Sequence, residues 1–180
     1  MSLFGRRRAK VPLPVTAARL VEQRRLSYRL SRVQRFTGDS TTLFEVLCDV
    51  ASWPAWVPGA SHVEALSWDE PGLRVRVQGR RLGVAVDAVH RMDPSHGPLL
   101  TTVAYESLLV GGKPYSYGDE HLLWYELSER VGYTDVEAGF ASRPGSGGKA
   151  FELRAASPLI TRDLQAALAG LIEEATRREG

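Results

Sequence analysis

The stretch TLFEVLCDVASWPAWVPGAS, residues 42–61, decides how the rest of the chain is interpreted. Its apolar residues recur at steps of three and four, which predicts a short amphipathic helix; they are Leu43, Phe44, Val46, Leu47 and Val50. The polar residues 37–40 before it supply N-cap oxygens for this helix. Ser52 is expected to cap a second short helix, in whose first turn Pro54 is tolerated. The Pro-Gly pair at the end of the stretch terminates that helix, and a strand should follow.

Length and composition favour one soluble domain. The chain has 180 residues, of which 43% are hydrophobic, enough for a substantial core in a single domain. Its single cysteine, Cys48, excludes an intrachain disulfide. The longest apolar runs are well short of the ~20 residues that a membrane-spanning helix needs. We therefore expect a cytoplasmic protein.

Positive charge is concentrated near the N-terminus. Residues 1–35 hold ten Lys or Arg and one acid, Glu22, or about +9, whereas the whole chain carries +2. Residues 1–14 have no helical or strand periodicity, and their prolines disfavour both structures, so we expect a flexible basic arm. The prolines also interrupt the apolar core that a signal peptide would need. Residues 15–180 should form the single domain, beginning with a possible short helix over 15–25.

The arm has the charge to contact an anionic membrane or RNA. Cationic side chains release counterions at phosphates, and each contributes ~1 kcal/mol near an anionic bilayer; those of the arm are Arg6, Arg7, Arg8 and Lys10. The alternative is an ordinary solubilising tail. Only Phe4 could stack on a base, and no nucleic-acid-binding motif follows, so no specific nucleic-acid partner is expected.

Alternation of apolar residues predicts a sheet of about seven strands. Residues 26–36 alternate, and six further segments read as strands separated by turn residues; they are 61–68, 73–81, 84–92, 99–107, 115–127 and 132–142. Six successive strands without a helix favour an antiparallel meander. A long C-terminal helix is expected from Ser157, as N-cap, to about Arg178, with Pro158 in its first turn. Residues 150–156 fit either a strand end or an early helical turn.

The sequence resembles the SRPBCC superfamily, also called START-like or birch-pollen-allergen-like, and in particular its polyketide cyclase/dehydrase-type branch. The resemblance rests on Leu43-Phe44 as the apolar-aromatic pair, Asp49 as the acid, and Trp53-Pro54-x-Trp56-x-Pro58 as the tryptophan-proline corner. Gly38-Asp39 stands where the family usually has Ala-Pro. The resemblance implies an α+β helix-grip fold, in which a curved antiparallel sheet wraps around a long C-terminal helix and leaves an internal cavity.

Strand parity and helix periodicity select the residues expected to face that cavity. The candidate ligand-binding residues are Trp56, Val86, His90, Val103, Tyr105, His121, Leu123, Tyr125, Val136, Phe140, Leu164, Leu168 and Leu171. Asp87 and Glu106 have the opposite parity and should be solvated. Trp53 and Trp56 fit the core as well as the cavity rim, and Asp49 is expected to cap the second short helix rather than to act in chemistry.

The sequence contains no motif for a metal or a cofactor. The four histidines lack the paired spacing of a zinc site, and no phosphate loop, nucleophile elbow or dinucleotide fingerprint is present. His90 and Tyr105 are the candidate catalytic residues, because imidazole and phenol can act as acid-base groups on a ketone. The alternative is that they fill space and make one hydrogen bond each.

Three functions remain open at this point. The preferred hypothesis is a carrier or binding protein whose cavity takes a hydrophobic small molecule such as a lipid, a quinone or a polyketide, because this needs no catalytic residue. The second is a polyketide cyclase, aromatase or dehydratase. The third, an adaptor to an anionic surface through the arm, is compatible with either. Fold alone does not distinguish them, and neither the oligomeric state nor the ligand follows from the sequence.

Overall fold

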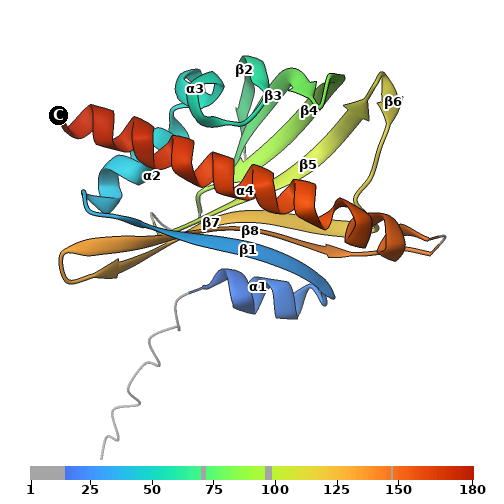
Figure 1. The fold of residues 1–180 in the computed structure, drawn as a ribbon, viewed down its shortest axis with the longest axis horizontal. Coiled ribbons are helices and arrows are strands. Elements are labelled where there is room, and N and C mark those ends of the chain that lie inside the picture. The colour runs from blue at the N-terminus through green and yellow to red at the C-terminus, as the bar shows by residue number, and fades with distance from the viewer. Residues whose placement is uncertain (1–14, 70–71, 96–98, 147) are drawn as a thin grey trace, which may run out of the picture.

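A computed structural model describes residues 15–69, 72–95, 99–146 and 148–180. Its centre is one antiparallel sheet (Figure 1). The strands are β1 (Tyr28–Phe36), β2 (Ala60–Asp69), β3 (Gly72–Arg81), β4 (Val84–Asp93), β5 (Leu100–Val110), β6 (Lys113–Pro114), β7 (Glu120–Arg130) and β8 (Tyr133–Arg143). Their order across the sheet is β1-β8-β7-β5-β4-β3-β2, and the two-residue β6 pairs with β5. The expected meander is confirmed, and its last strand lies beside the first.

The helix α4 (Lys149–Glu179) crosses the concave side of this sheet, as Figure 1 shows. Its apolar stripe faces inward because residues three and four apart share one side of a helix; the buried members include Leu164, Ala167, Leu168, Leu171 and Ala175. Together with side chains of β1, β3, β4, β7 and β8 they form the main core. The helix-grip prediction is confirmed.

The start of this helix was predicted wrongly. It begins at Lys149, after Gly148 with a φ of 86°, and not at Ser157, so Pro158 lies inside the helix. The proline has no N–H for the carbonyl of Arg154, an exposed residue at which water can serve instead. The preceding carbonyl, that of Leu153, accepts hydrogen bonds from the hydroxyls of Ser157 (3.1 Å) and Tyr28 (3.0 Å). The helix therefore continues through the proline, and the ambiguous residues 150–156 are helical.

Three short helices form the corner that contains the quoted stretch: α2 (Ser40–Cys48), the 3-10 helix η1 (Val50–Ser52) and α3 (Trp53–Trp56). Asp39 is the N-cap of α2, and its carboxylate accepts from the amide of Thr41 at 2.9 Å. Ser52 stands at the N-cap of α3, as predicted, and Asp49 at the N-cap of η1, but neither side chain makes a cap hydrogen bond. Ser52 instead donates to the carbonyl of Asp49 (2.7 Å) and accepts from the indole N–H of Trp56 (3.2 Å).

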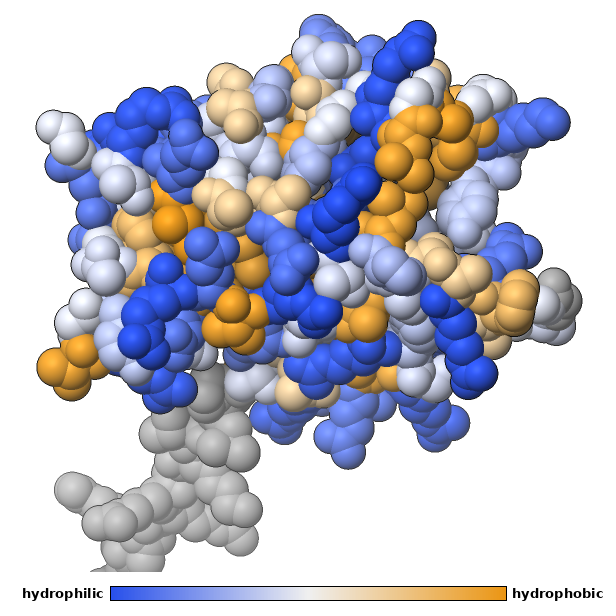
Figure 2. Space-filling view, in the orientation of Figure 1, coloured by the Kyte–Doolittle hydropathy of each residue, from blue (hydrophilic) through white to orange (hydrophobic). Residues whose placement is uncertain are grey.

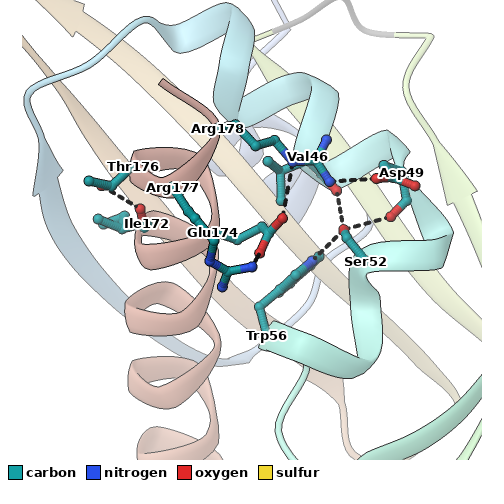
Figure 3. Close-up of polar contacts among 9 residues, drawn as sticks. All are labelled: Val46, Asp49, Ser52, Trp56, Ile172, Glu174, Thr176, Arg177 and Arg178. Carbon is teal, nitrogen blue, oxygen red and sulfur yellow. Dashed lines mark hydrogen bonds and ion pairs between the residues drawn. The ribbon is translucent and has the colours of Figure 1, made fainter. Parts of the chain in front are cut away.

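The carboxylate of Asp49 joins this corner to the end of α4, as Figure 3 shows. It pairs with Arg178 at 2.5 Å, and the same guanidinium bonds to the buried Glu174 at 3.1 Å. Arg177 reaches the other oxygen of Glu174 at 2.5 Å. We call these four residues the corner clamp. The clamp therefore ties the corner, to which Trp56 belongs, to the last turns of α4.

A second, smaller core covers the convex side of the sheet. The helix α1 (Ala17–Gln23) lies there, opposite α4 (Figure 1), and Thr16 is its N-cap. Its apolar side chains pack on the outward residues of β5, β7 and β8; the cluster is Ala17, Leu20, Val21, Leu26, Leu100, Leu122, Trp124 and Ala141. The basic arm of residues 1–14 lies outside the described residues. No helix in the described ranges is long and apolar enough to cross a membrane.

Candidate functional site

A cavity of about 420 Å³ lies between the concave face of the sheet, the corner and the first half of α4. Most of its wall is aliphatic or aromatic. Nine of the predicted ligand-binding residues line it, namely Trp56, Val86, His90, Val103, Tyr105, Leu123, Tyr125, Phe140 and Leu164. The structure therefore places these nine around one space, although they come from six different elements.

The other four predicted residues lie elsewhere. Val136, Leu168 and Leu171 are at most 1% exposed and belong to the packed core, because here the sheet and α4 touch each other directly. His121 lies between two strands. Strand parity for Val136, and helical spacing for Leu168 and Leu171, correctly placed these side chains on the inner face of their elements. Neither pattern carries information about the distance between the sheet and α4.

Inside the cavity, the imidazole of His90 stacks beside the phenol of Tyr105, with ring centroids 4.5 Å apart. The indole of Trp53 lies edge to face with the imidazole, with ring centroids 6.2 Å apart. Burial, followed by the charges of His121 and Arg81, lowers the pKa of His90 to about 4. Burial raises the pKa of Tyr105 to about 12. Both rings are therefore neutral at pH 7.

Two more tyrosines face the same space. Tyr125 contacts Trp56 edge to face at 6.0 Å, and burial raises its pKa to about 12. Tyr117 contacts Tyr105 and Phe140, and burial raises its pKa as well. All three phenols remain protonated at neutral pH, so each can donate a hydrogen bond.

Several polar side chains deep in the cavity wall lack protein partners. The hydroxyl of Thr101 is buried and makes no hydrogen bond within the described part of the chain. No side-chain hydrogen bond joins the phenols of Tyr105, Tyr117 and Tyr125, or the imidazole of His90, to another described residue. Buried polar groups are normally paired, because leaving one unpaired costs about 1–3 kcal/mol. These groups are therefore available to a molecule inside the cavity.

His121 closes a gap in the sheet. The pairing of β5 with β7 ends at Val103 and Leu123. Beyond this point the backbone N–H of Tyr105 donates to Nε2 of His121 at 2.9 Å, in place of a strand carbonyl. Such a bond requires an unprotonated Nε2, and burial lowers the pKa of His121 accordingly. The side chain is a structural bridge beside the cavity and not part of its wall.

Several wall residues escaped the sequence analysis because of a β-bulge. In β4 and β5, Val89 pairs with Ser107 but His90 pairs with Tyr105, which leaves Glu106 as the extra residue. The bulge reverses the parity of the rest of β5, so that Leu108 and Val110 face the cavity. The alternation of apolar and polar residues along the chain breaks at residues 106–107. This break was the signal in the sequence from which the bulge could have been predicted.

Residues 115–119, predicted as part of a strand, form a loop before β7. This loop brings Tyr115 and Tyr117 to the cavity wall. Asp87 and Glu106 lie on the outer face, as expected: Asp87 pairs with Arg76 at 2.6 Å, and Glu106 pairs with Arg74 at 2.7 Å.

An ion pair stands at the opening of the cavity. Arg81, the last residue of β3, contacts Asp163 of α4 at 3.0 Å, and both residues line the cavity. The pair joins the β3–β4 hairpin to the helix. It is the only salt bridge among the cavity-lining residues that the structure describes.

Within the described ranges, no group of three or more His, Cys, Asp or Glu side chains is arranged to hold a metal ion. Cys48 is half-buried in α2, and burial raises the pKa of its thiol.

No protein-family profile matches the sequence, and no curated protein matches it. Solved structures match its fold. Zhui aromatase/cyclase from Streptomyces superposes with a TM-score of 0.65 at 16% identity, over 85% of this chain and 96% of that chain. A protein from Thermus thermophilus gives 0.67 at 10% identity, over 85% and 100%. A START superfamily protein from Mycobacterium smegmatis gives 0.55 at 11% identity, over 83% and 95%. The chain therefore has the same fold as these structures, the helix-grip fold.

Proposed function

We propose that the chain binds an apolar small molecule that carries a few oxygen groups, such as a quinone or a polyketide-like aromatic, as a carrier or binding protein. The observation that supports this most directly is the cavity wall, which is mainly apolar but presents hydroxyls without protein partners. A volume of about 420 Å³ is within the range of about 300–1,000 Å³ that is usual for small-molecule sites. Apolar contact supplies affinity at about 25 cal/mol per Å², and the phenols provide the selectivity for oxygen groups.

The protonation states favour binding over acid-base catalysis. An effective general acid or base has a pKa near the working pH. The pKa of His90 is about 4 and that of Tyr105 about 12, so neither group exchanges a proton readily at pH 7. Hydrogen-bond donation by a neutral phenol needs no such exchange.

Binding is tested by titrating the protein with a hydroxylated naphthoquinone and, separately, with a saturated fatty acid. Trp53 and Trp56 line the cavity, so quenching of tryptophan fluorescence reports a bound quinone. We expect Tyr125→Phe to weaken quinone binding about five-fold, the effect of one hydrogen bond of about 1 kcal/mol. Tyr133→Phe, which changes a tyrosine stacked on Arg35 outside the cavity, is the matched control. Equal affinity for the fatty acid and the quinone in every variant would contradict a role for the phenols.

A cyclase or aromatase is the alternative, and the contact of His90 with Tyr105 inside the cavity supports it. The structural neighbour from Streptomyces is described as an aromatase/cyclase. Incubation with a poly-ketone decides between the two functions. Conversion to a cyclised product, lost in His90→Ala or Tyr105→Phe while the ligand still binds, would establish the enzyme. Recovery of the poly-ketone unchanged from the complex supports the carrier.

A further inference from the structure

The turn of the β3–β4 hairpin contains a leucine, Leu82, at a position where leucine is unfavourable. Arg81 pairs with Val84, so the loop consists of Leu82 and Gly83 alone. Their φ angles are 50° and 80°, which gives a turn with two left-handed residues. Asn, Asp and Gly are the usual residues there, because an L side chain with a Cβ is sterically disfavoured. Turn chemistry therefore does not explain a leucine at this position.

Core packing does not explain it either. Leu82 is 69% exposed, and its neighbour Val84 is 44% exposed. Both residues stand at the opening of the cavity. In Figure 2, hydrophobic residues gather on the upper right of the visible face, over the region where Figure 1 places β4 and β5. Neither turn chemistry nor core packing therefore accounts for an apolar side chain at this exposed position.

The surroundings of the tip are cationic. Arg80 lies beside Leu82, and its guanidinium donates to the carbonyl of Gly83 at 3.2 Å, which leaves the rest of the group exposed. Residues 79–86 contain two arginines and no acid. The adjoining turn, whose Gly111 lies against Val84, leads into Lys113, and residues 108–118 contain no acid. The carboxylate of Asp163 on α4 is paired with Arg81, and that of Asp87 farther along β4 is paired with Arg76.

We propose that the tip of the β3–β4 hairpin docks the cavity opening onto an anionic lipid bilayer, with Leu82 and Val84 among the acyl chains and Arg80 at the lipid phosphates. A bilayer suits this surface better than a protein does. A stable protein interface needs about 20–30 residues on each side, whereas an interfacial anchor works with a few apolar residues and adjacent cations. Docking here brings the cavity opening directly to the phase in which apolar molecules are dissolved.

The test measures cosedimentation of the full chain with phosphatidylcholine vesicles that contain or lack phosphatidylglycerol, with no ligand added. Leu82→Asn removes the apolar side chain but places a residue that tolerates positive φ. We expect its melting temperature to equal or exceed that of the wild type, and its partition onto anionic vesicles to fall about ten-fold. Arg80→Gln should lower partition about five-fold on the anionic vesicles and far less on the neutral ones.

Val131→Asn is the matched control, because Val131 is fully exposed at the β7–β8 turn and flanked by Glu129 and Arg130. It should bind vesicles as the wild type does. The basic arm is the same in every variant, so its own attraction cancels from the comparison. Tyr125→Phe tests the cavity and should leave vesicle binding unchanged, which separates a failure of docking from a failure of ligand binding.

Three results would overturn docking. The first is a wild-type protein that does not bind anionic vesicles, and the second is equal partition of Leu82→Asn and the wild type. The third is a change of oligomeric state in Leu82→Asn, seen by analytical ultracentrifugation, which would show that the tip contacts a second copy of the chain. Retained binding by Val131→Asn together with loss by Leu82→Asn supports the docking surface.

Discussion

Two buried aromatic side chains show how single residues determine the inside of this fold. His90 lies against Trp53 and Tyr105 in the cavity, where its imidazole is held neutral. Trp124 is completely buried on the other face of the sheet, where its ring lies over Gly139. His90 makes the stability of the fold depend on pH. Trp124 leaves no room for a Cβ at Gly139 on the neighbouring strand β8.

The histidine should make the folded protein less stable in acid. Its folded pKa is about 4, against about 6.5 in an unfolded chain. Between these values the unfolded chain binds a proton that the folded chain does not, so stability falls as the pH falls from about 6.5 to about 4. The loss at this site is at most about 3 kcal/mol. Urea unfolding at pH 7 and pH 4.5 should show a smaller drop in His90→Gln.

A residual drop is expected in that variant, because the pKa of His121 is lowered too. His62→Gln changes an exposed histidine of β2 and is the control. If it reduces the acid sensitivity as much as His90→Gln does, the buried imidazole is not the cause.

A methyl group at Gly139 should destabilise the sheet. A Cβ there would lie 2.0 Å from the indole of Trp124, whose ring cannot move because it is buried. Overpacking of this kind costs about 1–3 kcal/mol, and we expect Gly139→Ala to lose about 2 kcal/mol in urea unfolding. Gly145→Ala is the comparison, because its Cβ would meet only the carboxylate end of Asp119. A similar loss in both variants would point to the glycine backbone and not to the indole.

At the scale of elements, α4 both closes the cavity and holds the corner. Its first half carries Ala156, Leu159 and Leu164 into the cavity wall. Its last turns carry the corner clamp (Figure 3). Between α3 and α4 the packing is close, since a Cβ on Gly170 would lie 2.9 Å from the Cα of Trp56. The two ends of the helix can therefore be tested separately.

Replacement of the helix proline should stabilise the fold. Pro158→Ala restores the N–H that the carbonyl of Arg154 lacks, and a proline inside a helix typically costs about 3 kcal/mol. Part of this cost is absent here, because the carbonyl of the exposed Arg154 can bond to water. We expect a gain of about 1–2 kcal/mol in the free energy of unfolding. Pro144→Ala, before the helix, should bring no gain, because there a proline only restricts the unfolded chain.

The corner clamp should contribute unequally through its members. Asp49 is 40% exposed, so Asp49→Asn should cost at most about 1 kcal/mol, as for other surface pairs. Arg178→Ala should cost about 1–2 kcal/mol more, since it leaves the carboxylate of Glu174 buried with Arg177 alone. Thermal unfolding of both variants measures the difference. Equal costs would mean that Glu174 does not depend on Arg178.

At the scale of the whole molecule, one sheet separates two cores of different kinds. On the convex side, α1 packs closely on β5, β7 and β8. The concave side is packed only where α4 touches the sheet and is hollow elsewhere. A ligand that fills the hollow binds the folded state alone, so it should stabilise the whole domain.

A saturating ligand should therefore raise the melting temperature in a concentration-dependent way. At a hundred times its Kd, a ligand adds about 2.7 kcal/mol to the free energy of unfolding. Ala167→Phe fills the cavity from α4 and should abolish this stabilisation while the protein remains folded. Differential scanning fluorimetry with the naphthoquinone measures both effects. An equal shift in the filled variant would place the ligand outside the cavity.

The sequence by itself determined the order of the elements, the antiparallel meander, an N-cap within residues 37–40 and the inward face of most strands. These features depend on neighbours in the chain: on alternation, on helical spacing and on the N-cap chemistry of polar side chains. For this reason parity placed His90, Tyr105, Tyr125 and Phe140 on the inner side without any knowledge of the fold.

Only the tertiary structure decided which inward residues face open space and which are packed. Val136 and Leu168 obey the same periodicities as Val103 and Leu164, yet only the last two line the cavity, whereas the first two are packed in the core. The distance between sheet and helix is set by the curvature of all strands together, by the bulge at Glu106 and by the crossing of α4. The same non-local geometry brought Arg81 to Asp163 and left Leu82 at the opening of the cavity. The sequence could not predict these positions, because no local pattern of residues encodes the distance between the sheet and the helix.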